Sequence, residues 1–348
     1  MASDVHYHDY LQLDRILQAQ APESTRQGRP AHDEMLFIII HQTYELWFKQ
    51  LLYETDSVLD ILKKPVLNDN SPELQTVVHR MERMIRILQV LVHQVDILDT
   101  MTPMDFLDFR DMLRPASGFQ SWQFKMLEAR LGLKFEQRHG QEYYLSQLRP
   151  AQVDQIRQAE QEPSLLGLVN AWLERMPFFA PSYHWGDFAA PENPGGLHPF
   201  WAEYRRRFAE SLAPAEQGNL AAFENLFIQD SGETTGTALS REARRAALFI
   251  LLYRGYPVLH LPFQLLDALL EIDVHLSSWR YRHVNMVQRM IGARIGTGGS
   301  SGKGYLKEAA DRHYIFREVA QLNSYLIERS RLPALPAGLE ARLGFVAP

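Results

Sequence analysis

The stretch that decides the fold is Met35–Lys64, MLFIIIHQTYELWFKQLLYETDSVLDILKK, which is followed by Pro65. Its apolar residues recur at intervals of three and four, the period of an α-helix and not of a β-strand. The first turns are apolar on every side, so we expect this end of the helix to be buried all round. Asp33 stands just before them and is a plausible N-cap residue.

The helical period continues along most of the chain. A helix capped by Ser71 and running to about Asp99 carries an apolar stripe that suits lengthwise packing on another helix. Its members are Val77, Met81, Met84, Leu88, Leu91, Val95 and Leu98. Four more helices are expected: Thr102 to about Arg114 with Asp105 in a capping box, Phe119 to Leu131, Arg241 to Arg254 capped by Ser240, and Pro262 to Ile291.

No segment alternates apolar and polar residues for long enough to demand a strand. We therefore predict an all-α fold, with one helical domain over residues 1–348. A short N-terminal arm, 1–30, precedes the first long helix. The part 133–235 is rich in proline, glycine and polar residues and is expected to be variable and loop-rich.

Composition excludes several classes of function. Of the 348 residues 46% are hydrophobic and 22% charged, which is typical of a folded globular protein. A net charge of -6 gives no basic field for nucleic acid or an anionic membrane, and no apolar run is long enough to cross a bilayer. The absence of cysteine rules out disulfides, zinc–cysteine sites and thiolate-ligated haem. We expect a soluble, cytoplasmic protein that binds small molecules.

Two histidines lie on expected core faces. His41 shares a helix face with Phe37, and His283 follows Trp279 at helical spacing. A core histidine that makes one hydrogen bond is the ordinary explanation for either of them. A single inward histidine between facing helices also suits an axial haem ligand, and it suits haem better than zinc, which needs three or four protein ligands.

Two further features could bind a small anion. Arg110 precedes a Pro-Ala-Ser-Gly bend, where its guanidinium could hold a carboxylate by two parallel bonds; a solvated or ion-paired arginine is the alternative. The glycine-rich stretch 296–302 fits neither a P-loop nor a dinucleotide fingerprint. Its backbone and Thr297 could approach a ligand closely, although such a stretch can also be a simple linker.

Two other groups raise the possibility of a different metal. The run His32-Asp33-Glu34, with a remote histidine, matches the ligand pattern of mononuclear non-haem iron oxygenases, although Asp33 also suits a helix cap. Tyr7 and Tyr10 lie beside His6 and His8, where they could bind a metal or dock against a surface.

Taken together, these segments resemble the tryptophan 2,3-dioxygenase family. The resemblance rests on four motifs in the family's order: Tyr7–Asp14, His32–Trp47, Phe109–Asp111 with Ser117–Ser121, and Trp279–His283 with the glycine loop at 296–302. It covers residues 5 to about 306 and is weak between 133 and 235, a part that looks like that of the longer members of the family.

The resemblance implies a homotetrameric enzyme holding haem b, with His283 as the axial iron ligand. Such an enzyme inserts both atoms of O2 into the indole C2–C3 bond of L-tryptophan and gives N-formyl-L-kynurenine, the first step of the kynurenine pathway. His41 would then face the indole N–H and Phe37 would line the indole pocket. Arg110 would bind the substrate carboxylate and Thr297 the amino-acid end. Tyr7 and Tyr10, in the N-terminal arm, would reach the site of a neighbouring subunit.

Two alternatives to this function stay open. The same fold could oxygenate a modified tryptophan, or it could serve as a non-catalytic sensor of haem or tryptophan that keeps the pocket. Product mass distinguishes the first, because dioxygenation adds two oxygen atoms to tryptophan. Turnover of tryptophan under O2 would eliminate the second.

Overall fold

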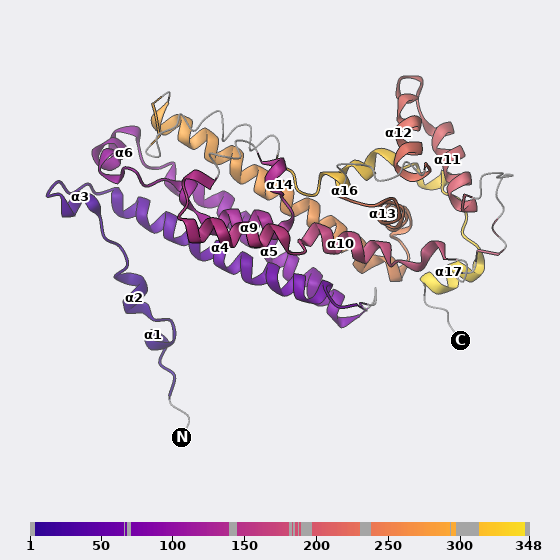
Figure 1. Ribbon diagram of the computed structural model, residues 1–348, viewed down its shortest axis with the longest axis horizontal. Coiled ribbons are helices and arrows are strands. Elements are labelled where there is room, and N and C mark those ends of the chain that lie inside the picture. The colour runs from indigo at the N-terminus through magenta and orange to yellow at the C-terminus, as the bar shows by residue number, and fades with distance from the viewer. Residues whose placement is uncertain are drawn as a thin grey trace.

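The computed structural model describes residues 4–65, 67, 71–138, 145–180, 183, 185–186, 188, 197–229, 238–292, 294–296 and 313–344. Within these residues the only regular structure is α- and 3₁₀-helix, so the predicted all-α fold is confirmed. The molecule is elongated, with a bundle of long helices at one end and a group of shorter helices at the other (Figure 1).

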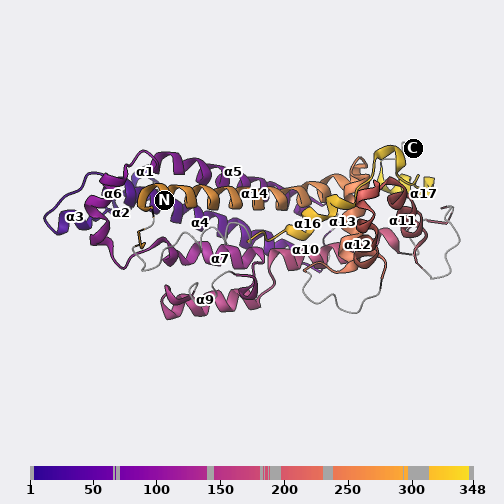
Figure 2. The same ribbon diagram turned by 90° about the horizontal axis from the view of Figure 1, so that it is seen from above.

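Four helices build the bundle, and they lie side by side in both views (Figures 1 and 2). They are α4 (Glu34–Leu62), α5 (Pro72–Leu98), α7 (Trp122–Leu131) and α14 (Pro257–Ile291). α5 packs against both α14 and α4, and α7 packs against α4. All seven residues of the predicted apolar stripe on α5 are buried, as the lengthwise contact requires.

Shorter elements surround the bundle. At its start lie α1 (Tyr7–Tyr10), α2 (Leu13–Leu17), α3 (Glu23–Arg26), α6 (Pro103–Arg110), η1 (Asp111–Leu113), η2 (Gly118–Gln120) and η3 (Phe135–Gln137). α1 and α2 form an arm that extends away from the bundle (Figure 1). α9 (Pro150–Gln161) packs on the outside of α7 (Figure 2).

The far end contains α10 (Leu165–Glu174), η4 (Pro177–Phe179), α11 (Pro199–Ser211), η5 (Pro214–Glu216), α12 (Gly218–Phe227) and α13 (Arg241–Tyr253). The C-terminal part adds α16 (Arg317–Gln321), η6 (Leu322–Tyr325), η7 (Arg329–Arg331) and α17 (Ala337–Leu343). The part 133–235 therefore contains more helix than its composition suggested.

Three of the four predicted helix caps are confirmed. Ser71 and Ser240 accept hydrogen bonds from the backbone N–H three residues on, and Thr102 forms a full capping box with Asp105. Asp33 is different, because its backbone is already helical and its side chain caps nothing.

Two expectations about the long helices are wrong. α14 begins at Pro257 and not at Pro262, because Pro257 occupies the first helical position, where a missing N–H costs no helical bond. The first turns of α4 are not buried all round: Met35 and Ile39 are exposed. These residues are four apart and share a face that no described element of the same chain covers.

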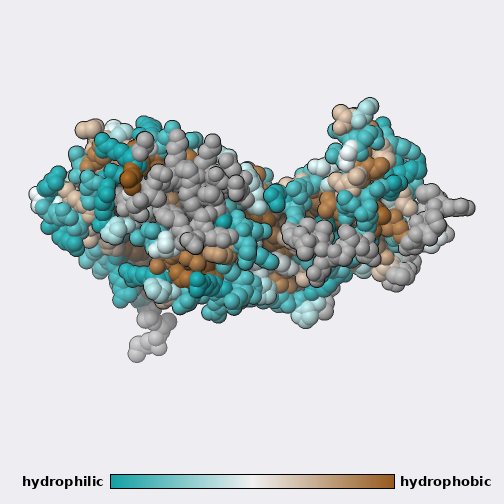
Figure 3. Space-filling view, turned by 45° about the horizontal axis from the view of Figure 1, so that its top comes forward, coloured by the Kyte–Doolittle hydropathy of each residue, from teal (hydrophilic) through white to brown (hydrophobic). Residues whose placement is uncertain are grey.

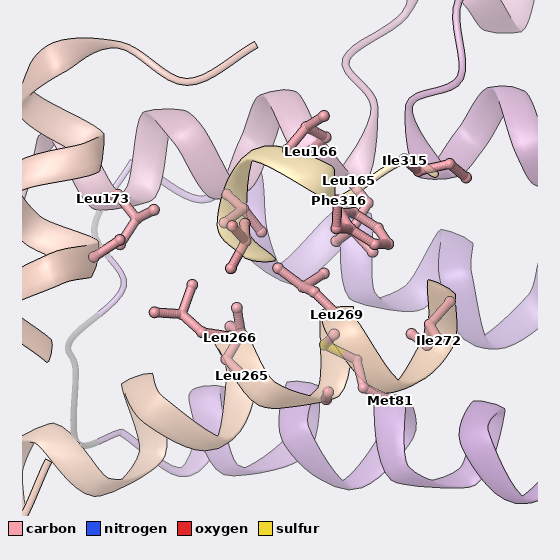
Figure 4. Close-up of a cluster of buried hydrophobic side chains, with 14 of the residues drawn as sticks. Met81, Leu165, Leu166, Leu173, Leu265, Leu266, Leu269, Ile272, Ile315 and Phe316 are labelled. Carbon is pink, nitrogen blue, oxygen red and sulfur yellow. The ribbon is translucent and has the colours of Figure 1, made fainter. Parts of the chain in front are cut away.

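A continuous apolar core joins the bundle to the far end. Figure 4 shows Leu265, Leu266 and Leu269 of α14 facing Leu165 and Leu173 of α10, with Phe316 between the two helices. α7 stops at Gly132, whose φ of +129° favours glycine, and a Cβ added there would lie 2.9 Å from the Cβ of Leu166. On the face shown in Figure 3, the molecule narrows between its two ends.

Among the described residues no single helix is both long and apolar enough to cross a membrane. α13 and α14 pass that test only as a pair bent by 114°.

Candidate active site

His41 is held in one tautomer by its own helix. Its Nδ1 lies 2.7 Å from the carbonyl oxygen of Phe37, one turn earlier on α4. A carbonyl can only accept, so the proton is on Nδ1 and Nε2 carries a free lone pair. Burial lowers the pKa of His41 and outweighs the opposing effects of the Phe37 bond and of Glu45. The side chain is therefore a neutral hydrogen-bond acceptor at neutral pH.

Aromatic side chains enclose His41. The ring of Phe37 lies 4.1 Å from the imidazole, centroid to centroid. Phe106 and Phe109, both on α6, lie 5.7 and 5.6 Å from Phe37. An apolar wall of this kind suits a flat aromatic ligand with one polar atom facing the imidazole.

His283 projects from α14 toward the same region. Burial lowers its pKa to about 4, and the proximity of His41 adds to the effect. Two imidazoles from different helices therefore lie near each other, and both are neutral. No described residue makes a hydrogen bond to His283, which leaves its lone pair available to a ligand. Trp279 stacks on it at 5.4 Å.

Trp279 belongs to an aromatic cluster that joins three helices. Its ring lies 4.9 Å from Phe124 on α7, 6.0 Å from Tyr44 and 6.1 Å from Phe48, both on α4. Burial raises the pKa of Tyr44 to about 12, and the buried indole N–H of Trp279 opposes this effect by interacting with the Tyr44 hydroxyl. The polar atom of Trp279 therefore contributes to the contact between α14 and α4.

Arg110 is not a solvated side chain. Only 4% of the residue is exposed, its Nε is buried without a partner, and its Nη2 donates to the carbonyl of Ile295. The nearest carboxylate, that of Asp111, is 3.9 Å away and exposed. Arg110 is thus a buried cation whose Nε has no partner among the described residues, at the base of the glycine-rich stretch, and it can accept an anionic ligand.

The structure does not bring every predicted site residue together. Thr297 lies outside the described residues, which include only Gly296 of the glycine-rich stretch. Tyr7 and Tyr10 are 71% and 74% exposed on α1, in the arm that extends away from the bundle (Figure 1). Within one chain they do not contact the histidines.

The geometry argues against iron at His32-Asp33-Glu34. Both carboxylate oxygens of Glu34 accept backbone N–H groups, from Glu23 at 2.8 Å and Ser24 at 2.9 Å. Glu34 therefore ties α3 to α4 and has a structural role. In the described ranges no three His, Asp or Glu side chains converge as a metal cluster would require.

Sequence reasoning missed part of this site. Phe106 and Phe109 are three residues apart on the short helix that also carries Arg110, and that spacing could have placed them on one face. No local signal could have paired Arg110 with the carbonyl of Ile295, which is 185 residues away.

The described residues fit haem better than a bare metal ion. A single neutral imidazole supplies one axial ligand, and the aromatic residues around it suit a large flat ring. The buried Nε of Arg110, which has no partner among the described residues, suits an anionic group at the edge of the ring or on a substrate.

A separate cavity of about 890 Å³ lies between α13, α14 and the segment from α16 to η7. It has an apolar floor that includes Leu266 and Leu270, and a rim with Arg254, Asp267 and Arg329. Neither His41 nor His283 lines this cavity, so the cavity is not part of the candidate active site.

Fold and site together define an all-helical protein in which two helices each present a neutral histidine among aromatic side chains. Residues 1–326 match the profile of the tryptophan 2,3-dioxygenase family. A tryptophan 2,3-dioxygenase of Bdellovibrio bacteriovorus is 42% identical over 98% of this chain and 98% of its own. Those of Alteromonas mediterranea and Dictyostelium discoideum are 42% and 39% identical over 98% of this chain and 97% and 88% of theirs.

This chain therefore belongs to the tryptophan 2,3-dioxygenase family, and it is an oxidoreductase.

Proposed function

We propose that the protein inserts both atoms of O2 into the indole C2–C3 bond of L-tryptophan, giving N-formyl-L-kynurenine in the first step of tryptophan catabolism through the kynurenine pathway. The observation that carries the proposal is the pair of neutral histidines from α4 and α14, which lie near each other among aromatic side chains. Membership of the family agrees with it.

His283 would hold haem b by an axial bond to the iron. The imidazole is neutral at physiological pH and has no competing hydrogen bond, so ligation needs no proton release. When bound, the haem supplies the iron that activates O2, and the protein supplies binding and orientation.

His41 would orient the substrate. Its Nδ1–H is held by the Phe37 carbonyl, so the free Nε2 can accept a hydrogen bond from the indole N–H. Phe37 would line the indole pocket, where it fixes the plane of the ring and excludes water. The geometry is set before the substrate arrives, which reduces the entropy lost in binding.

Arg110 would bind the substrate carboxylate through its buried Nε, which has no partner among the described residues. Its bond to Ile295 connects it with the glycine-rich stretch, where Thr297 would bind the amino-acid end of tryptophan. A buried arginine can form two parallel bonds to a carboxylate, which a lysine at this position could not reproduce.

Replacement of the proposed iron ligand tests the assignment. Haem-loaded protein should show a Soret band that His283→Ala loses. His275→Ala is the matched control, because His275 is on the same helix but is hydrogen-bonded to Gln89 on α5. A normal Soret band in the His283 variant would overturn the ligand assignment. Mass spectrometry of the product should show tryptophan plus two oxygen atoms.

The protein would act as a cytoplasmic homotetramer, in which Tyr7 and Tyr10 of one subunit reach the pocket of its neighbour. Support comes from a row of exposed apolar side chains along one face of α4, where spacings of four and seven place them in line. The row consists of Met35, Ile39, Leu46 and Tyr53. A face of this kind suits a partner helix better than water.

A further inference from the structure

A network of buried charges joins α7 to α14 beside the candidate active site. The carboxylate of Glu128 accepts Arg280 Nη2 at 2.7 Å on one oxygen and Arg138 Nη1 at 2.5 Å on the other. All three residues are almost completely buried. Burial opposes ionisation of Glu128, but Arg138, His313 and Arg280 outweigh it and hold its pKa well below the usual range. Glu128 is therefore a carboxylate at any physiological pH.

Arg280 is at the centre of this arrangement. Its second terminal nitrogen, Nη1, donates to the carbonyl of His313 at 3.0 Å, so the planar guanidinium is held at two points. Seven residues earlier on the same face of α14, the Asp273 carboxylate accepts the backbone N–H groups of Ile315 at 3.1 Å and Phe316 at 2.6 Å. α14 is thus bonded both to α7 and to the segment 313–316, which Figure 4 shows packed beside it.

A line of contacts leads from this network to His283. The guanidinium of Arg280 lies 5.8 Å from the ring of Phe124, Phe124 lies 4.9 Å from Trp279, and Trp279 stacks on His283. Arg280 is also only three residues from His283, so the two side chains leave α14 about one turn apart. The contacts that fix the position of Arg280 therefore also fix the surface of α14 that carries the His283 imidazole.

Apolar packing alone would fix this surface less well. Leucine-rich helix faces can turn or slide by small amounts at little cost, whereas a forked guanidinium tolerates only small changes in angle. At about 6 Å from the helix axis, a rotation of roughly 10° moves a side chain by about 1 Å. A shift of that size is enough to spoil the geometry of a metal ligand.

We propose that Arg280, held by Glu128, is a positioning residue that sets the orientation of His283 as the axial haem ligand. This inference rests on the proposed function, because it requires haem at His283. It adds to that function a buried ion pair that touches neither haem nor substrate but determines how the iron ligand is presented.

The variant Arg280→Lys tests the proposal. Lysine keeps the buried positive charge opposite Glu128 but cannot bond both Glu128 and the His313 carbonyl in one plane. We expect the variant to fold and bind haem. Its iron–histidine stretching band, measured by resonance Raman on the reduced protein, should shift and broaden, and transfer of its haem to apomyoglobin should be about tenfold faster.

Arg83→Lys is the matched control. Arg83 pairs with the buried carboxylate of Glu54 at 2.8 Å, between α5 and α4, so the substitution weakens a similar interhelical pair. Glu54 is thirteen residues from His41, roughly 20 Å along the helix. This control should leave both the band and the haem transfer rate at the wild-type values.

A second background shows whether the effect passes through His283. In His283→Gly protein supplied with imidazole, the ligand is no longer attached to α14, so Arg280→Lys should cause no shift. An equal shift in this background would overturn the proposal, and so would an unmoved band in the simple Arg280→Lys variant. Glu128→Gln, where it folds, should reproduce the Arg280→Lys band.

The proposed function and this inference fail in different ways. If the wild-type protein shows no iron–histidine band, the haem assignment is contradicted, and so is the positioning role of Arg280 that depends on it. A wild-type band that Arg280→Lys leaves unmoved would contradict the inference alone.

Discussion

His41 illustrates how one backbone contact determines the chemistry of a side chain. The bond from Nδ1 to the Phe37 carbonyl leaves Nε2 as an acceptor. We predict that His41→Ala keeps haem content near the wild-type level and lowers kcat/KM for tryptophan about fivefold or more, since a hydrogen bond in a buried site contributes about 1 kcal/mol or more.

His93 offers a control for this prediction. Its Nδ1 is bonded to the carbonyl of Gln89 one turn earlier, in the same manner, but the side chain is exposed on α5. His93→Ala should therefore leave steady-state activity unchanged. Loss of haem from His41→Ala would mean that His41, and not His283, is the iron ligand.

The lowered pKa of His283 has a consequence for the protein without haem. The folded-state pKa is about 4, below the unfolded value of about 6.5, so the unfolded chain binds the proton more tightly between these limits. Stability is fully present above about pH 6.5 and is lost as the pH falls toward 4. Urea titrations of His283→Leu should show a smaller loss between pH 7 and pH 5 than wild type. An equal loss would contradict the assigned pKa.

At the scale of single elements, helix starts were the most predictable feature. Ser71, Thr102 and Ser240 cap their helices as expected, because a hydroxyl satisfies backbone N–H groups only a few residues away. The start of α14 was harder to predict, since Pro257 and Pro262 are both compatible with a first helical turn. Contacts with α13 and α16 lie beyond any local pattern.

Gly132 ends α7, and its replacement should be costly. With φ at +129° and Leu166 only 2.9 Å from an added Cβ, Gly132→Ala should lower the free energy of unfolding by roughly 1–3 kcal/mol. Gly218→Ala is the control, because that glycine is at the start of α12 with nothing within 4 Å and no positive φ. It should be neutral or raise stability by up to about 1 kcal/mol. Urea denaturation of both variants measures the difference, and equal stabilities would contradict the argument.

At the scale of the whole molecule, the position of the N-terminal arm leads to a test of complementation between two inactive variants. Tyr7 and Tyr10 are exposed on an arm that extends away from its own bundle (Figure 1). We predict that Tyr7→Ala/Tyr10→Ala protein binds haem but has low activity, because its arm no longer completes a neighbouring pocket. Co-refolding it with His283→Ala chains, which have intact arms, should restore activity.

The arrangement of subunits decides the outcome of that experiment. Restored activity requires the arm of one chain to act at the haem of another. Mixed assemblies that stay as inactive as the separate variants would show that each arm serves its own chain. Size-exclusion chromatography should first confirm that both variants assemble like wild type.

The candidate site was predictable to the extent that helical spacing reveals it. His41, Phe37 and His283 lie on apolar faces that can be counted along the chain. The burial of Arg110 was not predictable, because its neighbours Phe109 and Asp111 suit a buried and a solvated position equally. The burial expected for the first turns of α4 was wrong at Met35 and Ile39, because apolar periodicity does not distinguish a face buried in the core from one available to another chain.

The sequence by itself determined the helical fold class, most helix starts and the two inward histidines, because each follows from periodicity or from contacts within a few residues. Only the tertiary structure showed that His41 and His283 lie near each other, that Arg110 meets Ile295, and that Glu128 holds Arg280 beside the proposed iron ligand. These pairs are separated by more than 150 residues, and tertiary packing brings them together: α5 packs on both α4 and α14, α7 packs on α4, and α6 packs on α14.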